Sequence, residues 1–246
     1  MKNLSSAFLI LLLLGIWEAI ARVMNAPFIL PSPVQVAVKV WELRHVLLVD
    51  HLPATLLIIV IALGISILFG VLIAVMMSQS QLAERAFYPV LIATQTIPII
   101  AIAPIFVLWF GYTIWSKVIV AILFTFFPIT VSTYDGFRTG STGLKELLCT
   151  MNASKKEIFM KVQVPAAMPS FFSGLKVAVP MSVIGAAVGE WLGAQEGLGY
   201  FSRRMMTQFD GAGVFAPIVL LSVLGILMFL AVVLLEKYLL RWRRFE

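Results

Sequence analysis

The chain has 246 residues, of which 61% are hydrophobic and 12% charged, with a formal net charge of +6 at pH 7. Soluble domains carry about 25% charged residues, so this composition excludes a soluble globule and predicts an integral membrane protein. A single cysteine, Cys149, excludes an internal disulfide and a multi-thiolate metal site. The positive residues flank apolar runs, which indicates membrane topology rather than nucleic acid binding.

Six apolar segments are long enough to cross a bilayer, which takes about 20 helical residues. They lie at roughly 5–23, 53–77, 87–110, 116–135, 170–192 and 214–239. The first follows Lys2 and resembles a signal peptide, but its length favours a retained span. The sequence therefore predicts an all-α, multi-pass membrane protein with one transmembrane domain, residues 1–246.

The distribution of lysine and arginine predicts the orientation of the spans. An even number of spans places both termini on one side, together with twelve of the 18 lysines and arginines. The opposite side would carry the other six: Arg22, Lys39, Arg44, Lys117, Arg203 and Arg204. The positive-inside rule then places both termini and the loop 143–169 in the cytoplasm.

The segment between the first two spans is polar and rich in turn signals. Residues 27–33 contain Pro27, Pro31 and Pro33, and residues 34–48 form an amphipathic stretch expected on the outer face. His45 and His51 are expected to be solvated loop histidines rather than a metal pair.

The third span contains Pro98 and Pro104. Proline frees backbone carbonyls that lipid cannot satisfy, so this helix faces protein or a water-filled path, or it is a Pro-kinked packing helix. Both interpretations stay open. On the first, Gln95 and Pro98 are candidate residues of a substrate pathway.

The longest polar interruption of the chain is predicted to form two short helices. The first covers 144–151, and Asn152 is suited to the left-handed conformation that ends a helix. Ser154 and Glu157 have the spacing of a capping box, which begins the second helix. This second helix is expected to end near Gln163, because Pro165 disfavours helical geometry in the residue before it.

The fifth span combines small residues with a carboxylate. Gly185, Gly189 and Gly193 form two G-x-x-x-G pairs, which predict close packing against spans of the same or of a second copy. A carboxylate within the bilayer is costly, so Glu190 either lines or gates a pathway or reaches the outer interface. Ser182, on the same helix, is a further candidate pathway residue.

The chain ends in Arg241-Trp242-Arg243-Arg244, which is predicted to anchor the last span among anionic lipid headgroups. The sequence contains neither a G-x-x-x-x-G-K-[ST] phosphate loop nor an H-E-x-x-H motif, so an enzyme is poorly supported. A self-sufficient secondary transporter or channel remains an alternative. Such proteins carry several intramembrane ionisable groups, however, whereas Glu190 is nearly alone here.

Several motifs resemble those of a known family. Glu146, Asn152, Val162, Val164 and Pro165 resemble the E-A-A-x3-G-x9-I-x-L-P loop of importer-type ABC transporter permeases. The chain departs from this pattern in having leucines for both alanines and Asn152 for the glycine.

Motifs outside the loop resemble one branch of these permeases, which imports nitrate, taurine, alkanesulfonates or pyrimidine precursors of thiamine. These motifs are L-P-S-P at 30–33, Q-T-I-P at 95–98, F-P at 127–128, E-W-L-G-A at 190–194 and G-L-G at 197–199.

The resemblance implies a six-helix, type I importer permease in the bacterial inner membrane. It would act as a homodimer with two ABC ATPase subunits and an extracytoplasmic solute-binding protein; the chain itself would bind no cofactor, and ATP and Mg²⁺ would bind the ATPase. The loop 143–169 would be the coupling segment that docks on the ATPase. Its expected contact residues are Glu146, Asn152, Ala153, Ser154, Glu157, Ile158, Phe159 and Pro165.

The resemblance also suggests a substrate. Residues 99–104, 171–176 and 182–186 look most like permeases for pyrimidine precursors of thiamine, such as an aminopyrimidine. Permeases for taurine, alkanesulfonates or nitrate are the alternative, because affinity in such systems lies mainly in the binding protein.

Overall fold

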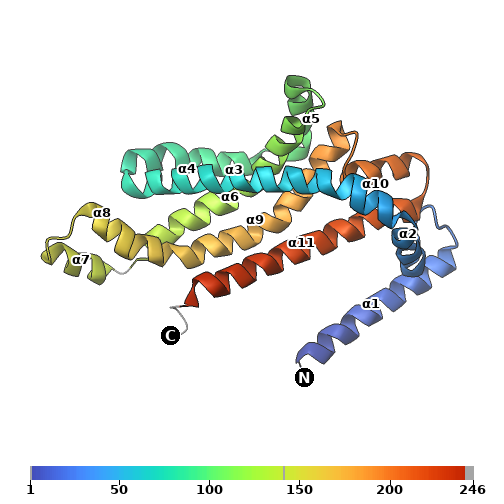
Figure 1. The fold of residues 1–246 in the computed structure, drawn as a ribbon, viewed down its shortest axis with the longest axis horizontal. Helices are drawn as coiled ribbons and strands as arrows, with labels where there is room; N and C mark the ends of the chain where they lie inside the picture. The colour runs from blue at the N-terminus through green and yellow to red at the C-terminus, as the bar shows by residue number, and fades with distance from the viewer. Residues whose placement is uncertain (1, 141, 242–246) are drawn as a thin grey trace.

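The computed structural model describes residues 2–140 and 142–241, and within them it contains helices and no strand (Figure 1). This confirms the all-α prediction. The anchor residues Trp242, Arg243 and Arg244 lie outside the described residues.

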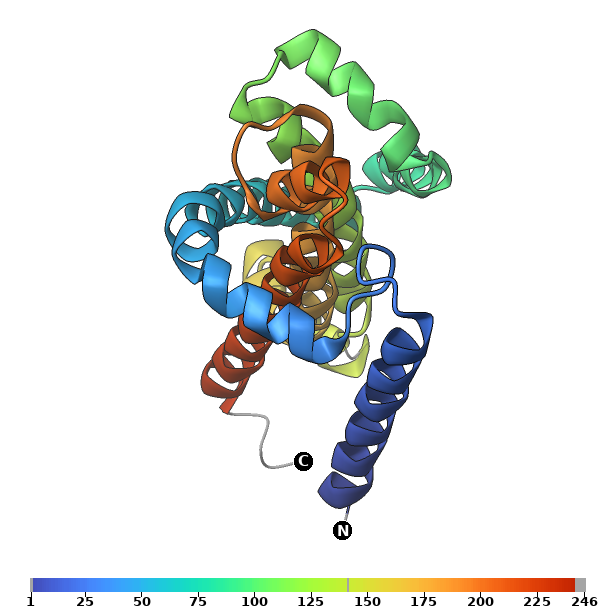
Figure 2. The same cartoon turned by 90° about the vertical axis from the view of Figure 1, so that its right-hand side faces the viewer.

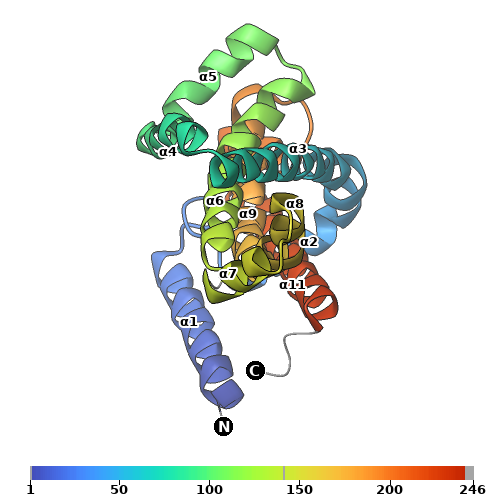
Figure 3. The same ribbon diagram turned by 90° about the vertical axis from the view of Figure 1, so that its left-hand side faces the viewer.

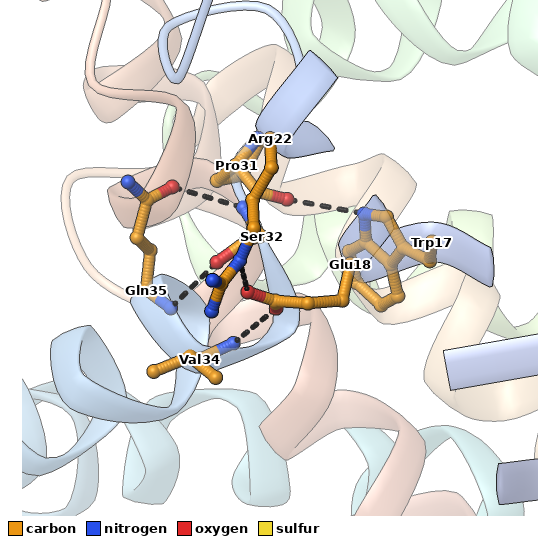
Figure 4. Close-up of polar contacts among 7 residues, drawn as sticks. All are labelled: Trp17, Glu18, Arg22, Pro31, Ser32, Val34 and Gln35. Carbon is orange, nitrogen blue, oxygen red and sulfur yellow. Dashed lines mark hydrogen bonds and ion pairs between the residues drawn. The ribbon is translucent and has the colours of Figure 1, made fainter. Parts of the chain in front are cut away.

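Helix α1, Lys2–Met24, stands apart from the remaining helices (Figures 1 and 2). It is attached near its C-terminal end, where Trp17 Nε1 donates a hydrogen bond to the Pro31 carbonyl at 3.1 Å (Figure 4). Glu18 accepts from Arg22 at 2.6 Å and from the Val34 amide at 3.4 Å. The proline-rich segment thus fixes the angle at which α1 leaves the bundle.

The next helical run is longer than predicted. Helix α2, Pro33–His45, continues through a π-helical turn, η1, Val46–His51, into α3, Leu52–Gln79. Ser32 begins α2 with a capping box. Residues 34–48 are therefore continuous with the span that follows, because no break divides α2, η1 and α3. Their place on the outer face stays a prediction.

The predicted third span is also wrong as a single helix. Helix α4, Gln81–Thr96, and helix α5, Ile99–Phe110, meet at an angle of 100°. Ile97, with φ −84° and ψ 124°, is extended, which is the conformation that a following proline imposes. Pro98 therefore breaks the span rather than kinking it.

Helix α6, Ile114–Arg138, and helix α9, Val164–Gly193, pack together along most of their length. A Cβ built on Gly185 would lie 2.7 Å from Ala121 Cα, and one on Gly189 would lie 2.9 Å from Lys117 Cα. At Gly193 a Cβ would lie 2.9 Å from a methyl group of Val107 in α5. The small face of α9 is therefore occupied by helices of the same chain, which approach closely because side chains are absent.

Two further helices complete the structure: α10, Leu198–Thr207, and α11, Gly211–Leu239. Helix α11 lies beside α9, and an ion pair of 2.9 Å joins Glu236 of α11 to Lys176 of α9. Asp210 begins α11 by accepting from the Gly213 amide at 2.9 Å and pairs with Lys39 of α2 at 2.9 Å.

Within residues 2–140 and 142–241, four helical runs are long and apolar enough to cross a membrane, and the bent pair α4–α5 would be a fifth. They are Pro33–Gln79, Ile114–Arg138, Lys155–Gly193 and Gly211–Leu239. The protein is therefore built to span a membrane several times. The count of six spans and the cytoplasmic termini stay predictions.

Candidate functional site

The loop between α6 and α9 begins with helix α7, Thr142–Thr150. The Asn152 amide donates to the Cys149 carbonyl at 3.0 Å, and the Ala153 amide donates to the Leu148 carbonyl at 2.9 Å. These two bonds form a Schellman motif, with Asn152 in the left-handed conformation at φ +58°. The predicted role of Asn152 in ending the helix is confirmed.

The capping box predicted at Ser154 is also present. The Glu157 amide donates to Ser154 Oγ at 3.3 Å, and the Ser154 amide donates to Glu157 Oε2 at 2.9 Å. Together they begin the short helix α8, Lys155–Ile158. The two caps give the loop a defined turn between α7 and α8.

The prediction that Pro165 ends the second helix is wrong. Helix α8 passes into a π-helical turn, η2, Phe159–Gln163, and then directly into α9. A proline ring clashes with the carbonyl four residues earlier, and the wider π-turn relieves this clash. A π-helical turn also precedes Pro53, because η1 ends two residues before it. The loop is thus continuous with a run of 39 residues, Lys155–Gly193.

The apolar side chains of the loop divide into an inner and an outer set. Phe159 packs on Phe137 of α6 with ring centroids 5.4 Å apart, and Val162 is buried. Phe159 therefore holds the loop to its own chain. The outer apolar set consists of the exposed residues Leu144, Leu147, Met151 and Met160.

The predicted contact residues differ in their exposure to solvent. Half of them are exposed: Glu146, Asn152, Ser154 and Glu157. Ala153, Ile158, Phe159 and Pro165 are half-buried. Leu144, Leu147 and Met151 are exposed but were not among the predicted contact residues, although their spacing of three and four residues places them on one face of a helix.

The four candidate pathway residues do not meet in one site. Gln95 and Pro98 are exposed at the break between α4 and α5, whereas Ser182 and Glu190 are buried in α9. Ser182 Oγ donates to the Val179 carbonyl of its own helix at 2.6 Å.

Glu190 is fully buried. Its Oε2 accepts from the Gly199 amide at 2.6 Å, while its Oε1 is buried and has no hydrogen-bond partner among the residues that the structure describes. Within a single chain the carboxylate therefore neither lines an open path nor reaches the surface.

His51 departs from its prediction as a solvated loop residue. It is 7% exposed, and its Nδ1 accepts a hydrogen bond from the Gly197 amide at 3.1 Å. The reason is that α2 and α3 are joined, so that no loop exists at this point. His45, six residues earlier, is exposed, and the part of the chain that the structure describes contains no group of three potential metal ligands.

An apolar groove of about 640 Å³ runs between α9 and α11. Val183 and Ile184 line it from α9, Ile218 and Leu221 line it from α11, and Ile100 of α5 also contributes to the lining. Its lining is almost entirely apolar, with two serine hydroxyl groups, of Ser202 and Ser222, and the indole ring of Trp191. Such a surface suits lipid or another helix rather than a polar solute.

These features define a helical membrane protein with a structured loop continuous with one of its spanning helices. Residues 66–241 match the family model of the binding-protein-dependent transport system inner membrane component, and the chain belongs to this family.

Individual relatives cover nearly the whole chain. The formylaminopyrimidine transport permease of Halalkalibacterium halodurans is 57% identical over 243 residues, or 99% of this chain and 97% of its own. The riboflavin transport system permease of Chloroflexus aurantiacus is 33% identical over 95% of this chain and 88% of its own. A putative aliphatic sulfonates transport permease of Bacillus subtilis is 29% identical over 94% and 84%.

The family match confirms the predicted resemblance. The chain is the permease component of an ABC transporter and resides in the inner membrane, and the family works in general with ATPase and binding-protein partners.

Proposed function

We propose that this chain imports an aminopyrimidine precursor of thiamine. The observation that carries the proposal is the 57% identity, over almost the full length, to a formylaminopyrimidine permease. Identity to the sulfonate permease of Bacillus subtilis is about half as high, at 29%.

The permease works as a homodimer, with the substrate path between two copies. Two features support this part of the proposal. The candidate pathway residues are separated within one chain, and the groove along α9 and α11 is too apolar to hold a polar solute by itself.

Energy comes from ATP hydrolysis on partner subunits that contact the loop 143–169. The support is mechanical: α8, η2 and α9 form one helical run, so a displacement of α8 moves α9 as well (Figure 3). The exposed residues Leu144, Leu147 and Met151 provide an apolar contact surface, and Glu146 lies beside them.

The test is uptake of labelled formylaminopyrimidine by cells that express this chain with its ATPase and solute-binding protein. Uptake should require all three proteins and should withstand an excess of unlabelled taurine or nitrate. Uptake of taurine or nitrate instead would contradict the substrate, whereas transport by this chain alone would contradict the partner-driven mechanism.

A further inference from the structure

The start of α10 is held by three side chains that come from three other elements. The consecutive amides of Gly197, Leu198 and Gly199 donate to His51 Nδ1 at 3.1 Å, to Thr55 Oγ1 at 2.9 Å and to Glu190 Oε2 at 2.6 Å, respectively. His51 belongs to η1, Thr55 to α3 and Glu190 to α9. We call these three side chains the α10 cap.

The α10 cap satisfies a need of the backbone. The first amides of a helix have no partner within the helix, and here they are buried away from water. Each amide therefore needs an acceptor, and each has one. Two of the acceptors, His51 and Thr55, lie far from α10 in sequence, and the third, Glu190, lies on the preceding helix α9. Loss of any one acceptor would leave a buried donor unsatisfied.

The backbone of the turn is shaped so that Glu190 can approach. Gly197 has φ +115°, a conformation that disfavours other residues, and a Cβ on it would overlap the Glu190 carboxyl group. A Cβ on Gly199 would lie 2.7 Å from the Ala187 carbonyl oxygen and 2.9 Å from Glu190 Oε2. The Glu190 carboxylate thus requires glycine at position 197, and the carboxylate and the Ala187 backbone together require it at position 199.

The His51 ring adds packing to its hydrogen bond. Its centroid lies 5.0 Å from that of Phe201, which is buried on the inner face of α10. The outer face of α10 carries the exposed residues Arg203, Arg204 and Met206. The α10 cap therefore fixes the direction in which this outer face points.

Helix α10 lies at the opposite end of α9 from α7 and α8 (Figure 1). If α7 and α8 contact the ATPase, as the proposed function requires, then α10 lies at the extracytoplasmic end. There it would meet the solute-binding protein.

We propose that His51, Thr55 and Glu190 are positioning residues, which join α10 to α3 and α9 as one body. Contact of the loaded binding protein with α10 is thereby transmitted to the two helices that run toward the ATPase. This inference rests on the proposed function. It adds that the response to the binding protein depends on three buried acceptors that touch neither substrate nor partner.

The test uses the assembled complex of permease and ATPase in proteoliposomes. ATP hydrolysis is measured with and without the solute-binding protein loaded with formylaminopyrimidine. In Thr55→Val, which keeps the shape but removes the acceptor, the ratio of stimulated to basal rate should fall about tenfold. Thr55→Ser restores an acceptor and should recover the ratio.

Thr133→Val is the matched control. Thr133 is also a buried threonine, but its hydroxyl donates only to the Ile129 carbonyl of its own helix, at 2.6 Å. This variant should keep the wild-type ratio. Glu190→Leu should lower the ratio as Thr55→Val does, whereas Glu190→Gln, which keeps an acceptor oxygen, should lose less.

A merely structural role of the α10 cap would reduce the amount of assembled complex, measured by gel filtration, without changing the ratio. A wild-type ratio in both Thr55→Val and Glu190→Leu would overturn the inference and leave the proposed function intact. A wild-type complex that does not respond to the loaded binding protein would instead contradict the proposed function.

Discussion

The two ends of α9 are held in different ways. At the α7–α8 end, the caps are formed by residues about three positions apart, and most of these residues are exposed. At the α10 end, two acceptors lie 146 and 143 residues from the amides that they bind, and all three acceptors are buried. One end is a local surface structure, whereas the other is a junction of distant segments.

This difference suggests that the two ends of α9 respond differently to a contact with a partner. Exposed hydrogen bonds exchange readily with water and are worth about 1 kcal/mol each, whereas a buried donor without a partner costs about 1–3 kcal/mol. The α7–α8 end can therefore adapt its side chains to a partner surface. The α10 end must move together with α3 and α9 or break buried bonds.

The largest effect should come from Asn152→Pro at the α7–α8 end. Proline fixes φ near −65° and has no amide hydrogen, whereas Asn152 has φ +58° and donates to Cys149. Uptake should fall to background while the protein stays in the membrane, as shown by immunoblotting of membranes. Asn152→Gly is the control and should keep uptake, and wild-type uptake in Asn152→Pro would exclude the coupling role.

A second prediction concerns the helix that joins the two ends. Gly185→Val would force side-chain atoms into Ala121 of α6, and overpacking of this kind costs about 1–3 kcal/mol. The Tm of the purified protein should fall by several degrees. Gly64→Val is the control, because a Cβ on Gly64 meets nothing within 4 Å; an equal fall in both variants would contradict the packing argument.

A smaller effect is expected for Ser154→Ala, which removes one side of the capping box. Loss of a helix cap costs about 1 kcal/mol. Uptake should fall a few-fold rather than vanish, because Asn152 and the Schellman motif remain. Ser154→Asp supplies another capping oxygen and should restore uptake; a null phenotype in Ser154→Ala with no recovery in Ser154→Asp would show that the hydroxyl has a different role.

The smallest effect concerns the ion pair between Asp210 and Lys39 at the α10 end. Although burial raises the pKa of Asp210, the Gly213 amide and Lys39 outweigh it and hold the pKa below the ordinary value of 3.8. Because the folded pKa is lowered, this contribution to stability is complete above about pH 3.8 and is lost as the pH falls through the lowered value. Asp210→Asn should therefore lower Tm slightly at pH 7, and the difference from wild type should disappear in strong acid. A difference that persists there would show that charge is not its cause.

The sequence predicts the α7–α8 end far better than the α10 end, for a physical reason. Asn152, Ser154 and Glu157 act on their neighbours, so residue type and spacing are sufficient to place the caps. Glu190 and the glycines after it were recognised as a motif, but the bond to Gly199 depends on the fold of the turn. The role of His51 could not be predicted, since its partner lies 146 residues away.

The prolines show that helix ends cannot be predicted reliably from proline positions in the sequence. Pro98 breaks a span that was predicted to be continuous, whereas Pro53 and Pro165 follow π-turns and leave their helices unbroken. Other prolines, such as Pro128 of α6 and Pro217 of α11, lie inside α-helices without a π-turn. The presence of a proline in the sequence therefore does not by itself predict where a helix ends. The membrane character, the family and the capped loop were predictable because each depends on composition or on neighbouring residues.

The most direct test of the central claim is cysteine cross-linking between the loop and the ATPase subunit. The exposed Cys149 is first replaced by serine, and single cysteines are then introduced as Leu147→Cys on the outer face and Phe159→Cys on the inner face. The account predicts that Leu147→Cys cross-links to a cysteine on the contact surface of the ATPase subunit. It predicts no cross-link through Phe159→Cys, because the Phe159 side chain packs on Phe137 and faces its own chain. Cross-linking through Phe159→Cys alone, or through neither position in an actively transporting complex, would contradict it.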